Sequence, residues 1–199
     1  MKSELALCGD AKVLLGQLAT AVKEPLCKKE SPWWKALNEN CEKNKQATDA
    51  LVKDVSLPMN YYSTLKIIED AIHKLPSDFI LVSEGSNTMD IGRTILTNEV
   101  ARQRLDAGTF GTMGVGFGFA IAAQSLYPNK KVVMVVGDSA FGFSAMEMET
   151  AARYNLPIKC IIINNNGISR GVEEITKEDN ALTIPINALL PNAKYEMIS

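Results

Sequence analysis

The sequence of 199 residues predicts an α/β fold built on a doubly wound parallel sheet. Three continuous apolar runs, at residues 79–83, 131–136 and 158–163, have the length and composition of strands that are covered on both faces. A helical pattern and a proline separate the last two runs, as in a strand–helix–strand unit. Because doubly wound domains usually have about five or six strands, we expect this sheet to be incomplete at the C-terminus.

The first 28 residues predict one short strand and one helix. Residues 4–8 have the composition of a buried strand, and Asp10 can cap a helix that ends before Pro25. One strand and one helix bury too little apolar surface to fold alone. We therefore interpret residues 1–28 as the tail of another domain.

Residues 29–57 are rich in charged side chains and predict a linker. Ser31 and Pro32 can serve as the N-cap and the first residue of a helix. The neighbouring Trp33 and Trp34 could dock on another surface. We favour an ordered polar linker helix over an aromatic ligand site.

The segment that follows carries the signals of the main domain. Apolar residues at helical spacing predict a helix over 61–74, and the strand at 79–83 ends in the polar turn 84–87. That turn is compatible with a phosphate or cofactor contact and equally with a plain strand–helix connection. Residues 108–126 contain five glycines, which suits a ligand-facing loop up to Met113 followed by a closely packed helix that could also form a subunit interface.

Composition and motifs argue against several function classes. The net charge of −2 gives no reason to expect nucleic acid or a membrane surface as a partner. No apolar run approaches the ~20 residues of a membrane span. The four cysteines are scattered without a C-x-x-C pair, which favours reduced thiols, and the single histidine, His73, argues against a Ser-His-Asp triad. The glycine spacing matches neither a dinucleotide fingerprint nor a P-loop.

The strongest functional signal lies at the ends of two neighbouring strands. Gly137-Asp138-Ser139 ends one strand, and Asn165 follows the next strand, 27 residues after Asp138. Because the carboxyl ends of parallel strands meet at one edge of the sheet, we expect Asp138 and Asn165 to lie close together. A carboxylate, an amide and a backbone carbonyl suit Mg²⁺ held together with a phosphate.

A capping signal follows the acidic turn. Ser144 and Glu147 have the S-x-x-E spacing of a capping box, which predicts that the next helix starts there. A helix N-terminus next to the acidic turn would favour a bound phosphate, because its N–H groups and its dipole attract negative charge.

Several motifs resemble enzymes that depend on thiamine diphosphate. Asp138 and Asn165 match the family signature GDG…N, with Ser139 in its third position. The wider sequence resembles 2-hydroxyacyl-CoA lyases most and oxalyl-CoA decarboxylases next. The similar segments are EGSNTMDIGR (84–93), RLDAGTFGTMGVGFGFAIAA (104–123), GDSAFGFSAMEMETAARYNLP (137–157) and NNNGI (164–168).

The resemblance implies that residues 58–199 form the domain that binds diphosphate and Mg²⁺, and that residues 1–28 end a central Rossmann-like domain. In that family pattern, Asp138, the Asn165 side chain and the Gly167 carbonyl would ligate Mg²⁺. Met113 would be the apolar residue beneath thiamine that forces its bent conformation. The further cofactor contacts implied by the resemblance are Asn87, Ser139, Ala140 and Ile168.

The resemblance also implies an activity. The expected reaction is the cleavage of a 2-hydroxyacyl-CoA, in fatty acid alpha-oxidation, into formyl-CoA and an aldehyde one carbon shorter. The full enzyme would be a homo-oligomer, a dimer or a tetramer, and peroxisomal by resemblance, or otherwise cytoplasmic. The alternatives are an oxalyl-CoA decarboxylase and a non-catalytic module for cofactor binding or protein interaction.

Two departures from the family pattern matter. Ser169 stands where the family usually has a tyrosine tied to the active site, which affects how substrate would be handled. The glutamate that activates the cofactor belongs, in the family, to an N-terminal pyrimidine-binding domain, and no glutamate of this sequence can be assigned that role. We therefore expect the chain alone to be inactive, with no catalytic residue of its own.

Overall fold

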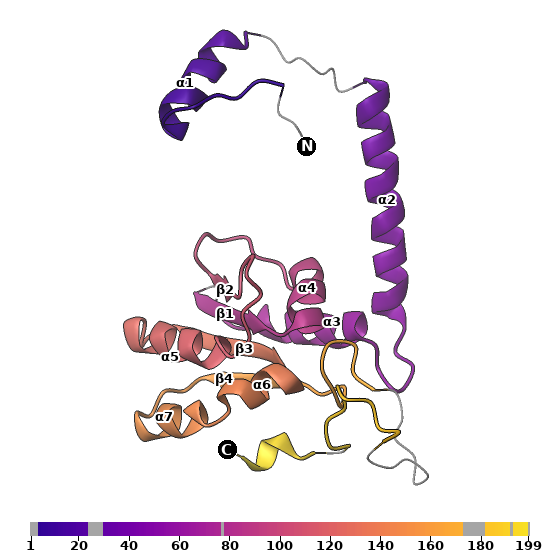
Figure 1. Ribbon diagram of the computed structural model, residues 1–199, viewed down its shortest axis with the longest axis vertical. Helices are drawn as coiled ribbons and strands as arrows, with labels where there is room; N and C mark the ends of the chain where they lie inside the picture. Colours follow the sequence, from indigo (N-terminus) through magenta and orange to yellow (C-terminus); the bar gives the residue numbers. More distant parts are fainter. Residues whose placement is uncertain (1–3, 24–29, 77, 173–181, 192, 199) are drawn as a thin grey trace. The chain divides into compact units, whose positions relative to one another are not determined.

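The computed structural model describes residues 4–23, 30–76, 78–172, 182–191 and 193–198 (Figure 1). By its internal contacts the chain divides into two units, Met1–Ala50 and Leu51–Ser199. The second unit contains the sheet and the candidate site. Pro25, which was expected to end the first helix, lies outside the described residues.

The two N-terminal helices begin where the sequence predicts. The carboxylate of Asp10 accepts a 3.0 Å hydrogen bond from the Val13 N–H and caps α1 (Ala11–Ala21). The Ser31 hydroxyl accepts a 3.4 Å bond from the Trp34 N–H at the start of α2 (Pro32–Lys53). The strand predicted at residues 4–8 is wrong, because these residues are exposed and belong to no strand of the sheet. A lone strand leaves its backbone groups to water and gains nothing from pairing.

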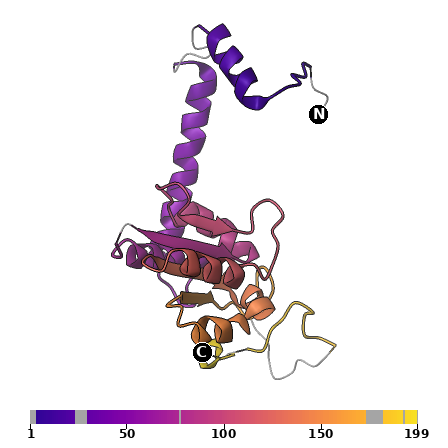
Figure 2. The same ribbon diagram turned by 90° about the vertical axis from the view of Figure 1, so that its left-hand side faces the viewer.

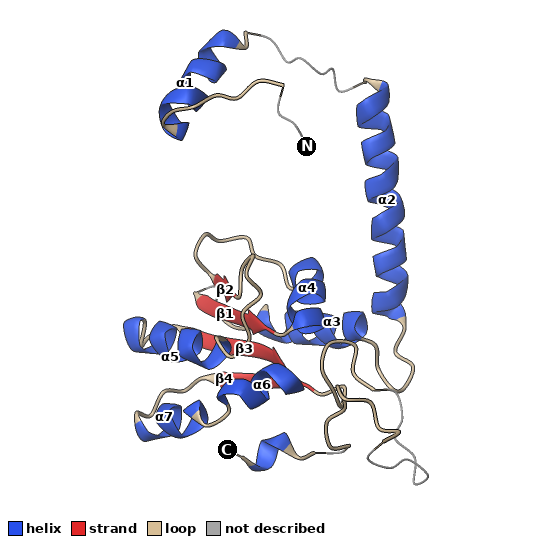
Figure 3. Cartoon of the chain, viewed as in Figure 1, coloured by secondary structure: helices blue, strands red, loops and turns tan. Residues whose placement is uncertain are grey.

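The sheet has four parallel strands in the order β2-β1-β3-β4 (Figure 3). The strands are β1 (Phe79–Glu84), β2 (Arg104–Asp106), β3 (Lys131–Gly137) and β4 (Lys159–Ile163). The three predicted strands are confirmed, and β2 was missed because it is three residues long and mostly charged. The chain moves from β1 to β2 on one side and then to β3 and β4 on the other. The strand order therefore reverses between β1 and β3, which is where open α/β sheets bind ligands.

Helices cover both faces of this sheet, which confirms the doubly wound architecture. Side chains alternate along β1, with Ile80 and Val82 in one apolar cluster and Phe79 and Leu81 in the other. The first cluster packs against α5 (Gly116–Leu126), α6 (Asp138–Ser144) and α7 (Glu147–Arg153), and the second against α3 (Tyr61–Ile72) and α4 (Ser86–Ile95). Figure 2 shows α5 lying across the near face of the sheet. A short 3₁₀ turn, η1 (Tyr195–Met197), adds Tyr195 to the first cluster.

The predicted capping box at Ser144 and Glu147 is wrong. Helix α6 starts at Asp138, directly after β3, and Ser144 is its last residue. Glu147 begins the next helix, α7, without a side-chain cap, and the Ser144 hydroxyl is buried with no hydrogen-bond partner among the described residues. The early start has a packing cause, because it turns Phe141 into the apolar core, where it is 1% exposed. The acidic turn therefore lies at a helix start, one helix earlier than expected.

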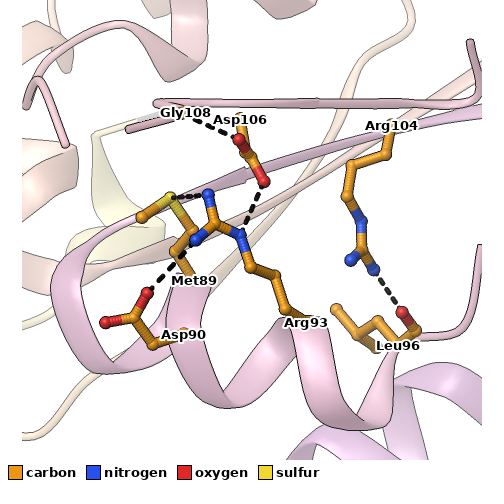
Figure 4. A network of polar contacts seen from close by, with 7 residues as sticks. All are labelled: Met89, Asp90, Arg93, Leu96, Arg104, Asp106 and Gly108. Atoms are coloured by element: carbon orange, nitrogen blue, oxygen red, sulfur yellow. Dashed lines mark hydrogen bonds and ion pairs between the residues drawn. The ribbon is translucent and has the colours of Figure 1, made fainter. Parts of the chain in front are cut away.

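A polar network ties β2 to α4 (Figure 4). The Asp106 carboxylate at the end of β2 accepts a 3.0 Å hydrogen bond from Arg93 Nε and a 2.8 Å bond from the Gly108 N–H. The bond from Arg93 is the main cause that lowers the pKa of Asp106. Arg93 also lies 3.5 Å from Asp90 on its own helix. This network fixes the start of the glycine-rich loop to the sheet.

Two further sequence expectations can be compared with the described residues. No helix among them is long and apolar enough to cross a bilayer. Cys8, Cys41 and Cys160 are free thiols, as their spacing predicts, and Cys27 lies outside the described residues.

Candidate functional site

A pocket of about 130 Å³ opens at the carboxyl ends of β1, β3 and β4, where the strand order reverses. Loops after all three strands contribute to its walls, together with the glycine-rich loop. The structure brings all eight sequence-predicted cofactor residues to this one pocket. They are Asn87, Met113, Asp138, Ser139, Ala140, Asn165, Gly167 and Ile168.

Asp138 is the centre of the polar wall. Its side chain is 2% exposed, and its Oδ1 accepts a 2.6 Å bond from the Ser139 N–H. Its Oδ2 accepts bonds from the Asn165 N–H at 3.2 Å and the Gly167 N–H at 3.1 Å. As the spacing predicts, Asp138 and Asn165 meet at the edge of the sheet. Burial raises the pKa of Asp138, and these N–H donors oppose that rise.

The Asn165 amide is oriented by two acceptors. Its Nδ2 donates to the Tyr61 hydroxyl at 2.8 Å and to the Ser169 carbonyl at 3.0 Å. Both hydrogens of the amide are thereby used, and within the described residues no donor binds Oδ1. Since Oδ1 is an acceptor only, it remains available to a cation.

Tyr61 is a site residue that sequence reasoning missed. Its position on the apolar face of the predicted helix indicated a core side chain, and its ring does pack against the second apolar cluster. The hydroxyl nevertheless reaches the pocket, where it accepts the hydrogen bond from Asn165 Nδ2. A tyrosine at a helix start combines an apolar ring with a polar tip, and only that chemistry could have suggested the role.

The connection after β1 supplies a place for an anion. Gly85 has φ +100°, and a Cβ there would lie 3.1 Å from the Gly137 backbone nitrogen, so this glycine lets the two strand ends approach each other closely. Helix α4 begins at the next residue without a side-chain cap, and its first residues, Ser86, Asn87 and Thr88, line the pocket. Free N–H groups at a helix N-terminus favour phosphate.

The polar turn 84–87 divides its residues between two environments. Asn87 lines the pocket, whereas Glu84 is the last residue of β1 and is 1% exposed. The Glu84 carboxylate accepts hydrogen bonds from the Gly114 N–H and, at 2.6 Å, from the Gly116 N–H. Burial raises the pKa of Glu84. Of the two alternatives left open for this turn, a ligand contact therefore remains for Asn87, whereas Glu84 faces the start of α5.

The donor set fits a small hard cation beside a phosphate. The described residues contain no cluster of three or more His, Cys, Asp or Glu side chains, the usual ligands of transition metals. The pocket instead offers one buried carboxylate, one amide oxygen and backbone carbonyls next to the uncapped start of α4. Oxygen ligands that leave room for substrate phosphates are typical of Mg²⁺ sites.

Comparison with known proteins identifies the domain. The family model described as "Thiamine pyrophosphate enzyme, C-terminal TPP binding domain" matches residues 83–183. The chain belongs to this family. The matched range contains every pocket residue named above except Tyr61, and thiamine pyrophosphate is another name for thiamine diphosphate.

The similar proteins include 2-hydroxyacyl-CoA lyases and oxalyl-CoA decarboxylases. The chain is 46% identical over 205 residues to 2-hydroxyacyl-CoA lyase 1 of Mus musculus, covering 94% of this chain and 35% of the relative. It is 44% identical over 139 residues to oxalyl-CoA decarboxylase of Escherichia coli K12, covering 70% of this chain and 24% of the relative. The chain thus spans about a third or less of the length of these relatives.

One solved structure supports the fold. The thiamine diphosphate-dependent 4-hydroxybenzoylformate decarboxylase of Rhodococcus jostii RHA1 superposes with a TM-score of 0.50 at 23% sequence identity. The match covers 57% of this chain and 21% of that one. At this identity the similarity concerns the arrangement of strands and helices alone.

Proposed function

We propose that this chain forms the diphosphate-binding half of a 2-hydroxyacyl-CoA lyase. The enzyme would cleave a 2-hydroxyacyl-CoA into formyl-CoA and an aldehyde one carbon shorter, as in fatty acid alpha-oxidation. The observation that carries the proposal is that Asp138 and Asn165 meet in one pocket. Tyr61 and Ser169 accept the hydrogen bonds of Asn165 Nδ2, which leaves Asn165 Oδ1 available to a cation. The similarity to named 2-hydroxyacyl-CoA lyases over nearly the whole chain supports the substrate class.

The proposed magnesium ligands are Asp138, the Asn165 side chain and the Gly167 carbonyl. The two side chains lie on neighbouring strand ends, and Asp138 also holds the backbone of the other two residues through hydrogen bonds to its Oδ2. This arrangement fixes the distance between the loops before any ion binds. Preorganisation of that kind lowers the ordering cost of binding.

The remaining pocket residues would hold thiamine diphosphate. The uncapped start of α4, with Asn87, would bind the diphosphate together with Ser139 and Ala140 at the start of α6. Met113 and Ile168 are the apolar side chains that would support the rest of the cofactor. When bound, thiamine diphosphate supplies the nucleophilic carbon and the electron sink for cleaving a bond next to a carbonyl.

We propose that this chain binds its cofactor without turning substrate over. None of the described glutamates lines the pocket, and Glu84, the nearest in sequence to it, is held by backbone N–H groups elsewhere. A carboxylate that activates the cofactor would have to come from outside the described residues. Release of an aldehyde from a 2-hydroxyacyl-CoA by the isolated chain would contradict this point.

Oligomer formation and the cell compartment are two further parts of the proposal. Phe119 and Leu126 of α5 are 37% and 73% exposed, which supports a homo-oligomer that covers this helix. The peroxisome is proposed as the compartment from the similarity to 2-hydroxyacyl-CoA lyases. Oxalyl-CoA decarboxylase is the second candidate activity, favoured by the 44% identity over 139 residues.

Calorimetry with thiamine diphosphate and Mg²⁺ tests the central proposal. We expect binding by the wild-type chain that is lost in Asp138→Ala, because that substitution removes one proposed ligand and the acceptor for two loop N–H groups. Absence of binding by a folded wild-type chain would instead favour a non-catalytic interaction module.

A further inference from the structure

Glu84 is a buried carboxylate that the proposed magnesium and diphosphate contacts do not use. It is 1% exposed at the end of β1, and no cation pairs with it among the described residues. A buried charge is costly unless hydrogen bonds satisfy it. The burial of the Glu84 carboxylate therefore requires a structural explanation.

The explanation lies at the start of α5. Both carboxylate oxygens of Glu84 accept backbone N–H groups, Oε1 from Gly114 and Oε2 from Gly116, the latter at 2.6 Å. Gly116 is the first residue of α5, and the N-cap residue Val115 provides no side-chain hydrogen bond. A carboxylate from another strand thus takes the place of a local N-cap, and the helix dipole stabilises its charge.

The fit between Glu84 and Gly116 leaves no room for a side chain. A Cβ on Gly116 would lie 2.5 Å from Glu84 Oε2, whereas a Cβ on Gly118, one half-turn further along α5, would meet nothing within 4 Å. Gly116 is therefore required by the approach of the carboxylate, and Gly118 is not.

Met113 connects this buried contact to the pocket, because it lies just before Gly114 and Gly116, the two glycines that donate to Glu84. Met113 packs against the first apolar cluster and also lines the pocket. Its backbone is joined to Gly114, whose N–H donates to Glu84 and whose φ of +85° turns the loop into the helix. The position of the Met113 side chain at the pocket wall thus depends on the backbone that Glu84 holds.

We propose that Glu84 is a positioning residue, which holds the Gly114–Gly116 backbone and thereby places Met113 against bound thiamine diphosphate. This inference rests on the proposed function for the identity of the ligand. The hold of Glu84 on the loop concerns the protein alone.

Amide hydrogen exchange tests that hold without any ligand. In Glu84→Gln, one acceptor oxygen becomes an NH₂ group, which cannot accept a backbone N–H. We expect exchange at Gly114, Gly116 or both to accelerate about tenfold or more, as for the loss of a hydrogen bond to a charged group. Gly116→Ala should have the same effect by displacing the carboxylate. The matched controls are the exposed Glu147→Gln and Gly118→Ala.

Comparing two ligands then distinguishes a specific effect on Met113 from a general loss of structure in the pocket. Magnesium pyrophosphate needs only the diphosphate contacts, whereas magnesium thiamine diphosphate also touches Met113 in the proposed site. We expect calorimetry on Glu84→Gln to show thiamine diphosphate binding about tenfold weaker than in the wild type and pyrophosphate binding unchanged. The factor of about ten corresponds to the loss of one hydrogen bond to a charged group. Equal weakening of both ligands, or unchanged exchange at both amides, would overturn the proposal. If the wild type binds neither ligand, the proposed function fails, and the exchange rates alone decide the role of Glu84.

Discussion

Removing the Tyr61 hydroxyl should weaken magnesium binding although Tyr61 is not a proposed ligand. In Tyr61→Phe, Nδ2 of Asn165 loses its 2.8 Å partner and keeps only the Ser169 carbonyl. The amide can then rotate, and Oδ1 faces the cation for a smaller part of the time. One neutral hydrogen bond contributes about 1 kcal/mol, which corresponds to an affinity about fivefold lower.

Calorimetric titration of Mg²⁺ at saturating thiamine diphosphate measures this change. Tyr62→Phe is the matched control, because Tyr62 is the next residue of α3, packs against the same apolar cluster, and makes no side-chain hydrogen bond with other described residues. Equal affinities for Tyr61→Phe and wild type would refute the orienting role of the hydroxyl. A similar loss in Tyr62→Phe would attribute the effect to α3 packing.

Three further predictions concern stability and reactivity. Gly118→Ala should raise the free energy of unfolding by about 0.5–1 kcal/mol in urea titrations, because an exposed helix position with open space gains from alanine; a loss of stability would contradict the open space. Arg93→Gln should lower that free energy by about 0.5–1 kcal/mol at neutral pH, a value kept small because the Arg93 side chain is 40% exposed. Since Arg93 lowers the pKa of Asp106, this difference should be present above about pH 4 and disappear as the pH falls through the lowered pKa, and a difference that grows in acid would refute it. Burial raises the pKa of Cys160 to about 11, so iodoacetamide at pH 8 should modify it at least about tenfold more slowly than the exposed Cys8, as peptide mass spectrometry can measure.

The parts of the fold that the sequence predicts are those with strong local signals. Continuous apolar runs identified β1, β3 and β4, because strands buried on both faces require such runs. Strand β2 has only three residues, two of them charged, and therefore carries no such pattern. Its place is set by pairing with β1 and by the contact between Asp106 and Arg93. The capping box failed because the burial of Phe141 outweighed a local capping preference.

The residues of the candidate site also differ in how far local sequence signals predict their position. Asp138 and Asn165 could be placed together because a parallel strand–helix–strand unit converts sequence spacing into proximity. Tyr61 could not, since it contacts Asn165 across 104 residues through a hydroxyl at the end of an otherwise apolar side chain. For the turn 84–87, the sequence left a ligand contact and a plain strand–helix connection open, so it gave Glu84 no definite role. Its actual partners, 30 and 32 residues away, belong to a helix start that lacks its own cap.

Asp138 and Glu84 show that burial and titration alone do not identify a ligand-binding carboxylate. Both lie at the ends of neighbouring strands, both are at most 2% exposed, both accept backbone N–H groups, and burial raises the pKa of each. They differ in what their donors belong to. The donors to Oδ2 of Asp138, Asn165 and Gly167, lie in the loop after β4 at the pocket, where a cation could share the carboxylate. The donors of Glu84 are Gly114 and the first residue of α5, and they occupy both of its oxygens. Under the proposed function, Asp138 would bind the cation, whereas Glu84 would hold the backbone next to Met113.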